Sequence, residues 1–575
     1  MKRILEILVS AVLVSAALNC ATQGVYNPEI SFSTAWWETQ ILKCVLSGTC
    51  TDQTPPTLVV GNLSSSHNVI LESGFIVGTA SDDLLLSRIE ISADSGPFLP
   101  AVGTNTWQYQ IPSQWKSGSS HSVQVRSFDF AGNASPTQNF SFKKGSNKDI
   151  NGDGFPDLAA TASLFSTTKN GEIYLFYGLG SGTVVPNSTS MANVTITGDT
   201  TSSFGYALQL GDLNGDGYAD LAAGGSFEYG SGTGQLYVFY STGKNGIVAA
   251  SFANANLTIN AGPSTLLGYS LSLGDVNGDG FTDIAASGYL GAGRALIYYG
   301  GAAGVSSTPA TTITGPGSNF GSAVRLGDLN GDGFADMIVN GNTYSASAGR
   351  LWIFHSTGSA GITAVDTSAP TWTLTGISAS DSFGISMTTG DINADGYEDL
   401  IAASPGYSGN LGRVYVFHGG TTGISAASPA TANQTLTGAV AGERFGTDVA
   451  LGDINGDGFL DLASAAILYN ASMGRLHLFH FSGGTISATA STLITGEATN
   501  DQFGIPTFLD CNGDGYSDLV VGAQGNTNAA GRAYLFRSPG SSGLTVSLAT
   551  SANAAISGYN LPGPTGSIFG STFGH

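Results

Sequence analysis

The sequence is poor in charged residues, and poorest in those that carry positive charge. Asp, Glu, Lys and Arg make up 10% of the 575 residues, against roughly 25% in an average protein. Lys and Arg number 19 against 41 Asp and Glu, which gives a net charge of −22 at pH 7. A chain with so few cations attracts neither nucleic acid nor an anionic membrane surface. We therefore expect no nucleic-acid partner.

Histidines and catalytic signatures are also scarce. The chain has seven His, and it contains no H-E-x-x-H zinc motif, no Walker phosphate loop and no serine nucleophile elbow. His355, His418 and His480 share one position of an internal repeat that other copies fill with Tyr or Arg. A position that accepts such different side chains is typical of a strand end at the surface. We expect a protein that is not an enzyme.

Only one long segment is predominantly apolar, residues 4–18, which Glu6 interrupts, and only four residues are cysteines. Residues 4–18 are too short to cross a bilayer comfortably but have the size of a signal-peptide core. Cys20 follows directly, in Ala17-Leu18-Asn19-Cys20, which resembles a bacterial lipoprotein signal whose cysteine becomes lipidated. The alternative is a plain secretory signal cut nearby. We expect residues 1–20 to direct export to the cell surface or outer membrane, with a lipid anchor as the membrane contact, or to secrete the protein.

The other cysteines are consistent with an exported protein. Cys44 and Cys50 lie six residues apart and are expected to close a small disulfide loop. Cys511 has no evident partner and is expected to be buried.

An acidic nine-residue string, D-x-N-x-D-G-x-x-D, occurs seven times. The copies begin at Asp149, Asp212, Asp275, Asp328, Asp391, Asp453 and Asp510. Their starts are 53 to 63 residues apart. A fixed period of this size predicts a propeller, solenoid or array.

Two glycine-containing patterns recur with the same period as this string. Phe-Gly, as in Phe204-Gly205, precedes most copies, and a Gly followed by an apolar run, as in Gly234-Gln-Leu-Tyr-Val-Phe, comes after each. These runs predict four short antiparallel strands per repeat and seven repeats. The first copy lacks a preceding Phe-Gly strand, whereas residues 568–574 supply a surplus one. We expect this last strand to complete the first sheet.

Together these three signals resemble the FG-GAP repeats of the integrin α-subunit N-terminal propeller. The resemblance covers residues 149–575 and implies an all-β chain with a seven-bladed β-propeller at 145–575. It also implies that the propeller recognises a ligand through its loop face.

The acidic string has the composition of a calcium loop. Calcium prefers six to eight oxygen ligands, and positions 1, 5 and 9 offer carboxylates, position 3 an amide and position 7 a main-chain carbonyl. An EF-hand would need Glu at position 12, where these copies have Ala, Val or Ser. We expect up to seven structural Ca²⁺ ions. The predicted ligands are Asp149, Asn151, Asp153, Phe155, Asp157; Asp212, Asn214, Asp216, Tyr218, Asp220; Asp275, Asn277, Asp279, Phe281, Asp283; Asp328, Asn330, Asp332, Phe334, Asp336; Asp391, Asn393, Asp395, Tyr397, Asp399; Asp453, Asn455, Asp457, Phe459, Asp461; and Asp510, Asn512, Asp514, Tyr516, Asp518.

A second domain is expected before the propeller. Residues 21–54 read as a tether, and residues 55–144 contain alternating runs near 75–80, 88–92, 107–111 and 121–126 that predict a β-sandwich. The segment 125–133 resembles bacterial Ig-like domains. We expect Trp107 in its core.

The sequence therefore predicts a calcium-stabilised cell-surface binding or adhesion protein for protein or matrix ligands. The alternatives are a lectin-like propeller for a glycan ligand and a structural envelope lipoprotein. Loops 227–234 and 341–349 are candidate contact regions, and Tyr229, Tyr344 and Tyr407 are candidate sugar-stacking residues.

Overall fold

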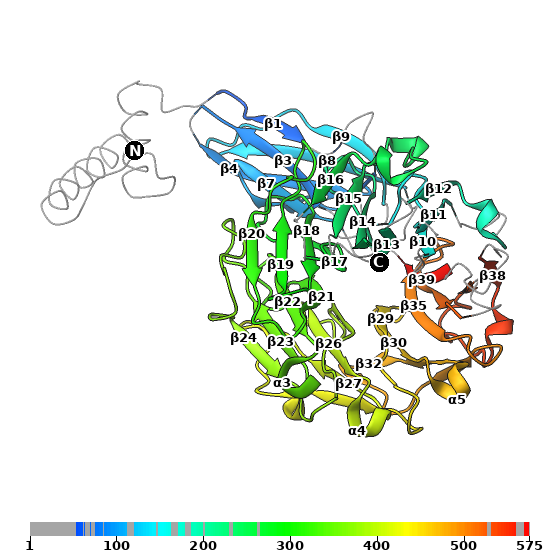
Figure 1. Ribbon diagram of the computed structural model, residues 1–575. Helices are drawn as coiled ribbons and strands as arrows, with labels where there is room; N and C mark the ends of the chain where they lie inside the picture. Colours follow the sequence, from blue (N-terminus) through cyan, green and yellow to red (C-terminus); the bar gives the residue numbers. More distant parts are fainter. Residues whose placement is uncertain are drawn as a thin grey trace, which may run out of the picture. The chain divides into compact units, whose positions relative to one another are not determined.

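A computed structural model of the chain describes two compact units of β-structure (Figure 1). The residues described are 53–60, 63, 69–70, 75–83, 85–111, 120–144, 148–162, 171–178, 186–198, 202–228, 234–260, 265–525, 531–558 and 569–573. The first unit comes mainly from residues up to 141, and the second mainly from 142 onward. None of the described helices is long and apolar enough to cross a membrane.

The described residues between Thr57 and Lys144 form two small sheets. One has the order β1 (Thr57–Val60), β3 (Phe75–Ser81), β7 (Thr106–Gln110), β6 (Val102–Gly103). The other has the order β2 (Val69–Ile70), β9 (Gln138–Lys144), β8 (Ser120–Asp129), β4 (Leu86–Ala93), β5 (Leu99–Pro100). The four strands expected from alternating runs are thus confirmed as β3, β4, β7 and β8. Trp107 is 3% exposed, as expected of a core residue.

The described residues of the second unit form seven four-stranded antiparallel sheets, which we number I to VII along the chain. Sheet I has the order β12 (Val194–Thr197), β11 (Glu172–Phe176), β10 (Leu158–Ala162), β39 (Phe569–Phe573). Sheet II has the order β13 (Ser202–Gly211), β14 (Asp220–Glu228), β15 (Gln235–Phe239), β16 (Leu257–Asn260). Sheet III is β17 (Ser270–Gly274), β18 (Asp283–Gly288), β19 (Arg294–Tyr298), β20 (Thr311–Thr314). Sheet IV is β21 (Phe320–Gly327), β22 (Asp336–Gly341), β23 (Arg350–Phe354), β24 (Trp372–Thr375).

The remaining three sheets repeat the same order. Sheet V is β25 (Met387–Gly390), β26 (Asp399–Ser404), β27 (Arg413–Phe417), β28 (Gln434–Thr437). Sheet VI is β29 (Val449–Gly452), β30 (Asp461–Ala466), β31 (Arg475–Phe479), β34 (Thr492–Thr495), with a side hairpin of β32 (Phe481–Ser482) and β33 (Thr485–Ile486). Sheet VII is β35 (Phe503–Leu509), β36 (Asp518–Ala523), β37 (Arg532–Phe536), β38 (Ala554–Ser557).

The seven sheets form a closed series. Each first strand contacts the first strand of the next sheet, and β39 contacts both β13 of sheet II and β35 of sheet VII. The expectation that the last strand completes the first sheet is confirmed, because β39 pairs with β10 through Ala160 opposite Phe573 and Ala162 opposite Phe569. A separate apolar cluster fills each of the seven junctions between neighbouring sheets.

The two glycine signals of the repeat meet at these junctions. Gly349, just before β23, lies so close to the main chain of Phe383 that an added Cβ would be 2.4 Å from its carbonyl oxygen. Gly412 and Phe445 repeat this approach between the next two sheets, with a Cβ distance of 2.0 Å. A side chain at either glycine would push the sheets apart. The spacing of Phe-Gly and Gly-x-aromatic in the sequence therefore reflects how one sheet docks on the next.

Short turns between strands were not expected from the sequence. α3 (Tyr344–Ser347), α4 (Tyr407–Asn410) and α5 (Tyr469–Ser472) join the second and third strands of sheets IV to VI. Each contains left-handed residues, such as Ser345 with φ 52° and Ser408 with φ 49°. Single 3₁₀ turns occur at η1 (Thr189–Met191), η2 (Gly243–Asn245), η3 (Phe252–Asn254), η4 (Pro429–Thr431) and η5 (Ala549–Ser551). Elements of three or four residues are too short to create a hydrophobic period.

Candidate metal centres

In sheets II to VII the acidic string connects the first and second strands, and in sheet I it directly precedes β10. The ninth residue begins the second strand in sheets II to VII, as Asp461 begins β30. It is buried in all seven sheets. The first residue is buried in sheet I and half-buried elsewhere, and the fifth is half-buried or exposed. Each loop therefore places its three carboxylates in a row from the interior to solvent.

The side chains of the loop organise its own backbone. In all seven copies the amide at position 6 donates to the carboxylate at position 1, over 2.8 to 2.9 Å. The amide at position 5 donates to the Asn oxygen at position 3, over 2.9 to 3.0 Å. The amide at position 7 donates to the carboxylate at position 5, over 2.9 to 3.1 Å. These bonds curl the chain around the oxygens.

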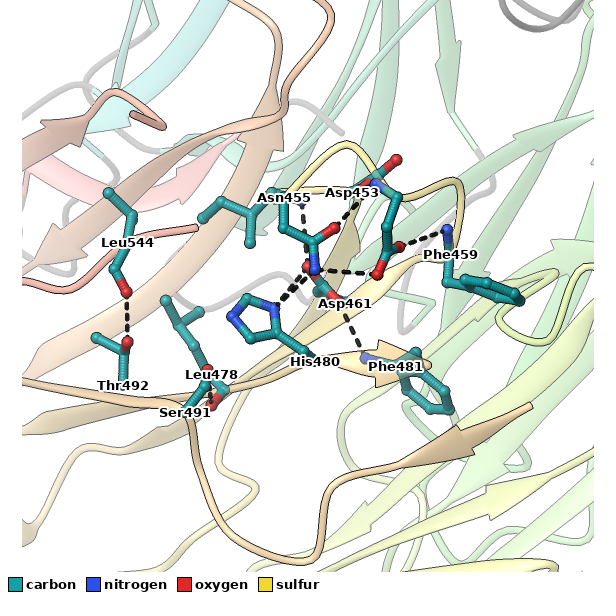
Figure 2. A network of polar contacts seen from close by, with 12 residues as sticks. Asp453, Asn455, Phe459, Asp461, Leu478, His480, Phe481, Ser491, Thr492 and Leu544 are labelled. Atoms are coloured by element: carbon teal, nitrogen blue, oxygen red, sulfur yellow. Dashed lines mark hydrogen bonds and ion pairs between the residues drawn. The ribbon is translucent and has the colours of Figure 1, made fainter. Parts of the chain in front are cut away.

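The ninth residue anchors the loop to the end of the third strand. In sheet VI, Asp461 accepts from the amides of Phe481 at 3.0 Å and Ile454 at 3.3 Å (Figure 2). The bond from the end of the third strand is present in all seven sheets, over 2.8 to 3.0 Å. In sheet VII the thiol of Cys511 also donates to Asp518, at 2.7 Å. Cys511 is buried, as expected.

The sharp bend in the loop depends on residues in the left-handed region. Position 6 is Gly with φ between 85° and 94° in all seven loops. Position 4 is Gly with φ between 68° and 74° in six loops, but in sheet V it is Ala394 with φ 58°. Side chains other than Gly rarely adopt this conformation because Cβ crowds the following carbonyl. Ala394 is therefore a strained exception.

Neighbouring loops are joined to one another. In sheets II, IV, V and VII the amide at position 8 donates to the carbonyl at position 1 of the preceding loop, as from Ser517 to Asp453 at 2.7 Å. The aromatic ring at position 7 lies on the glycine at position 4 of the preceding loop, and a Cβ on Gly331 would be 2.6 Å from Tyr397. The aromatic side chains thus pack between neighbouring loops. The prediction that their carbonyls face an ion stays a prediction.

The buried carboxylates hold their protons unusually tightly. Burial, reinforced by the neighbouring carboxylates, raises the pKa of the first residue to about 6 in Asp149, Asp212 and Asp510. The same causes raise the pKa of the ninth residue to about 8 in Asp220 and to about 7 in Asp283, Asp336 and Asp399. A cation in the loop would favour the charged form and reverse this shift.

The donor chemistry of the loops fits a hard divalent cation. Carboxylate and amide oxygens suit Ca²⁺, whereas zinc and copper prefer nitrogen and sulfur. However, among the described residues no group of three or more His, Cys, Asp or Glu lies close enough together to hold a metal ion. Occupancy would therefore require the side chains at positions 1, 5 and 9 to draw together.

Three histidines lie beside the loops, a placement that the sequence did not reveal. His480 Nδ1 lies 2.9 Å from Asp461 Oδ2 (Figure 2), and this pair raises the pKa of His480. His355 Nε2 lies 3.7 Å from Asp336 Oδ2, and Asn393 donates to His418 at 2.9 Å. The signal in the sequence was that all three histidines occupy the same repeat position, after the third strand. From the sequence this position is expected at the surface, because the sequence does not show that antiparallel pairing places it next to the loop.

Several predicted sites lie outside the described residues. These are Cys20, Cys44, Cys50, Tyr229 and residues 229–233 of the loop 227–234. Tyr344 and Tyr407 are half-buried beneath arginines, with the Arg350 and Arg413 guanidinium carbons 4.9 and 3.9 Å from the ring centres.

Comparison with known proteins identifies the repeats. Residues 149–223, 275–339 and 453–521 match the FG-GAP-like repeat, and residues 383–417 match the FG-GAP repeat. Integrin alpha-5 of Xenopus laevis is 30% identical over 224 residues, 36% of this chain and 20% of that protein. Integrin alpha-7 of Rattus norvegicus is 35% identical over 152 residues, 24% of this chain and 13% of that protein. The chain thus carries FG-GAP repeats similar to those of integrin α-subunits.

The similarity extends to other proteins over similar lengths. Phosphatidylinositol-glycan-specific phospholipase D of Bos taurus is 33% identical over 153 residues, 24% of this chain and 18% of that protein. The chain spans a fifth or less of the length of these three relatives. A solved Dos1 propeller covers 70% of this chain and 88% of its own, at 11% identity and a TM-score of 0.37, which is too low to support an argument.

Proposed function

We propose that the protein is a calcium-stabilised binding or adhesion protein of the cell surface, built on a seven-bladed FG-GAP β-propeller. The closed series of seven four-stranded sheets supports the propeller. The two-sheet unit before it would be an Ig-like sandwich, and Cys20 would carry a lipid anchor. The similarity to integrin α-subunits supports a role in ligand binding.

The observation that carries the calcium proposal is the recurrence of one oxygen-rich loop in every sheet. Three carboxylates in each of seven loops account for 21 of the 41 acidic residues of the chain. Seven divalent ions would change the net charge from −22 to −8. Ca²⁺ would supply charge neutralisation at the buried Asp at positions 1 and 9, and the Asn at position 3 and Asp at position 5 would complete the oxygen set.

The loop face opposite the acidic strings supports a ligand site. The connections from second to third strands and from one sheet to the next both lie at that end, because the strands are antiparallel. There a hollow of about 510 Å³ is lined by residues 378–381 and 406–410. Tyr407 in this lining stacks under Arg413, which offers a ligand both an aromatic edge and a positive charge.

Metal removal tests the calcium proposal. A chelator should lower the melting temperature by several degrees and added Ca²⁺ should restore it, because each filled site contributes about 2.7 kcal/mol when free ion exceeds Kd about 100-fold. The variant Asp457→Ala should lose one bound ion by mass spectrometry. Asp366→Asn, at an exposed carboxylate outside the loops, is the control and should lose none. If the chelator leaves the melting temperature unchanged, the proposal is contradicted.

Ligand recognition is tested with intact cells and purified matrix proteins. We expect saturable, calcium-dependent binding by the full chain, weakened by Tyr407→Ala and unchanged by Asp366→Asn. Binding no stronger than that of an unrelated propeller would count against adhesion.

A further inference from the structure

A repeated hydrogen bond ties the fourth strand of one sheet to the next sheet. The first residue of that strand reaches the connection between the third and fourth strands of the neighbouring sheet. In sheet III the hydroxyl of Thr311 donates to the carbonyl of Ile362 at 2.6 Å. In sheet VI the hydroxyl of Thr492 donates to the carbonyl of Leu544, as Figure 2 shows. We call this contact the fourth-strand latch.

Sheet IV forms the same latch with a much larger side chain. The indole Nε1–H of Trp372, the first residue of β24, donates to the carbonyl of Ala426 at 2.6 Å. Because threonine makes the latch in sheets III and VI, the bond itself does not require an indole. Part of the ring is open to solvent, since Trp372 is 38% exposed. The two other described tryptophans, Trp107 and Trp352, are each 3% exposed.

The exposed ring borders a small uncharged hollow. Its volume is about 330 Å³, and it is lined by Pro370, Thr371, Trp372, Thr373 and Ala427. None of these side chains carries a charge. The hydroxyl oxygens of Thr371 and Thr373 already accept bonds from His355 N at 2.9 Å and Arg350 Nη2 at 3.0 Å, which leaves their hydrogens available to donate. Because side chains alternate along a strand, the hydroxyl of Thr373 lies on the face of sheet IV that carries Trp352, toward sheet III, whereas the Trp372 ring lies on the opposite face, toward sheet V. The indole ring is therefore the feature of this hollow that lies on the sheet V side.

We propose that Trp372 is a stacking platform for a neutral pyranose saccharide. The π-face of an indole is negatively polarised and attracts the positively polarised C–H groups on the flat face of a sugar ring. The latch holds the ring in one orientation, so little side-chain entropy is lost on binding. The net charge of −22 disfavours acidic saccharides.

This site lies at β24 and not in the loop face, and it requires neither bound calcium nor adhesion to a protein. A failure of the calcium or adhesion tests would leave it standing, and its own failure would not affect them.

The experiment uses the full chain and a panel of neutral methyl pyranosides and their oligomers, with glucuronate oligomers for comparison. Binding is measured by saturation-transfer NMR on the sugar protons and by tryptophan fluorescence. The decisive variant is Trp372→Thr, which keeps a latch of the kind formed by Thr311 and removes the platform. Its melting temperature should match that of the wild type, and its affinity should fall about tenfold or more.

Trp372→Phe, which keeps a ring without the N–H, should fall between the wild type and Trp372→Thr. The exposed Val365→Ala serves as the matched control and should bind like the wild type. The proposal is overturned if the wild type binds no neutral saccharide of the panel, or if Trp372→Thr binds as well as the wild type. Preference for glucuronate oligomers would also overturn it, as would a Trp372→Thr defect limited to a protein partner.

Discussion

At the scale of single residues, the acidic side chains of each loop act first on their own backbone. The same bonds to amides at positions 5, 6 and 7 recur in seven loops whose flanking residues differ. Asx-type bonds of this kind favour tight, non-helical turns. The loop conformation therefore depends on the Asp and Asn oxygens as well as on glycine.

Ala394 provides a test of this strain. Ala394→Gly should stabilise the protein by about 0.5–1 kcal/mol, because relief of the left-handed Cβ outweighs the added freedom of the unfolded chain. The other six loops have Gly at this position. Calorimetry should show a melting temperature about 1–2 °C higher.

The reverse substitution in the neighbouring loop is the control. Gly331→Ala should destabilise, because its Cβ would lie 2.6 Å from the Tyr397 ring and φ is 71°. If both substitutions moved the melting temperature in the same direction, the strain argument would be wrong.

Asp448 provides a pH test outside the acidic loops. It accepts from Ser386 and from the Val449 amide, each at 3.0 Å. Burial raises its pKa to about 6, although Arg325 opposes the shift. The folded state thus binds this proton more tightly than the unfolded state, and the associated stability is lost as pH rises from about 4 to about 6. Asp448→Asn, which stays neutral, should gain about 1–2 °C over the wild type across this interval.

The measurement is the difference in melting temperature between variant and wild type at pH 4, 5, 6 and 7.5 with calcium present. Bonds from Ser368 lower the pKa of the exposed Asp366, so Asp366→Asn is the control and should show no such gain. A difference for Asp448→Asn that is flat from pH 4 to 7.5 would refute the shift.

At this scale the sequence predicted part of the candidate site. The D-x-N-x-D-G-x-x-D spacing predicted the loop, because the loop is local to the string, and Cys511 was expected to be buried because it has no evident partner. The spacing did not predict His480 beside Asp461, since that contact arises only when residues 19 positions apart pair across strands.

At the scale of elements, the junctions between sheets depend on two contacts that repeat along the chain. Glycine before the third strand admits the main chain of the next Phe-Gly, and the fourth-strand latch closes the outer edge. The first excludes side chains, whereas the second requires a donor. In sheets III, IV and VI, where the latch is present, the two contacts together fix how a sheet sits on its neighbour.

The latch can be tested in isolation. Thr492→Val preserves the shape of the buried side chain and removes the donor, so the carbonyl of Leu544 loses its bond. We expect a loss of about 1 kcal/mol in unfolding free energy, measured by chemical denaturation. The exposed Thr258→Val on β16 is the control and should change stability little. Equal effects of the two substitutions would show that the latch contributes nothing.

Strands were predicted from the sequence more fully than the connections between them. Apolar runs bounded by glycine located the second and third strands of the sheets. The strands after Phe-Gly begin three or four residues late in sheets III, V and VI, at Ser270, Met387 and Val449. The glycine of the pair is left-handed in these sheets, but it is equally left-handed in sheets II and IV, where the strand includes the Phe-Gly pair. The turns α3 to α5 contain left-handed Ser, Ala and Asn residues, which no periodic pattern announces.

At the scale of the whole second unit, one short strand closes the series of sheets. The surplus Phe-Gly near the end of the sequence predicted this closure, because every other Phe-Gly is followed by an acidic string of its own. Residues 569–573 cover the edge of β10, which would otherwise offer unpaired main-chain groups to other molecules.

Truncation tests the role of this strand. A chain that ends at residue 568 should melt several degrees lower and form dimers in light scattering, because the edge of β10 is left open. A chain that ends at residue 573 keeps β39 and is the control. Should both chains melt like the full-length protein and stay monomeric, closure by β39 would not matter for stability.

The closing strand also sets an order on biosynthesis. Sheet I has three of its strands by Thr197, yet its fourth begins at Phe569, some 370 residues later. At about 5–20 residues per second the ribosome needs on the order of 20–70 s to cover that distance. During this interval the earliest sheet waits with one edge bare while the six others are synthesised. A nascent chain therefore cannot finish this unit piecemeal, and a translation product that stops early retains an adhesive edge that quality-control proteases and chaperones can recognise.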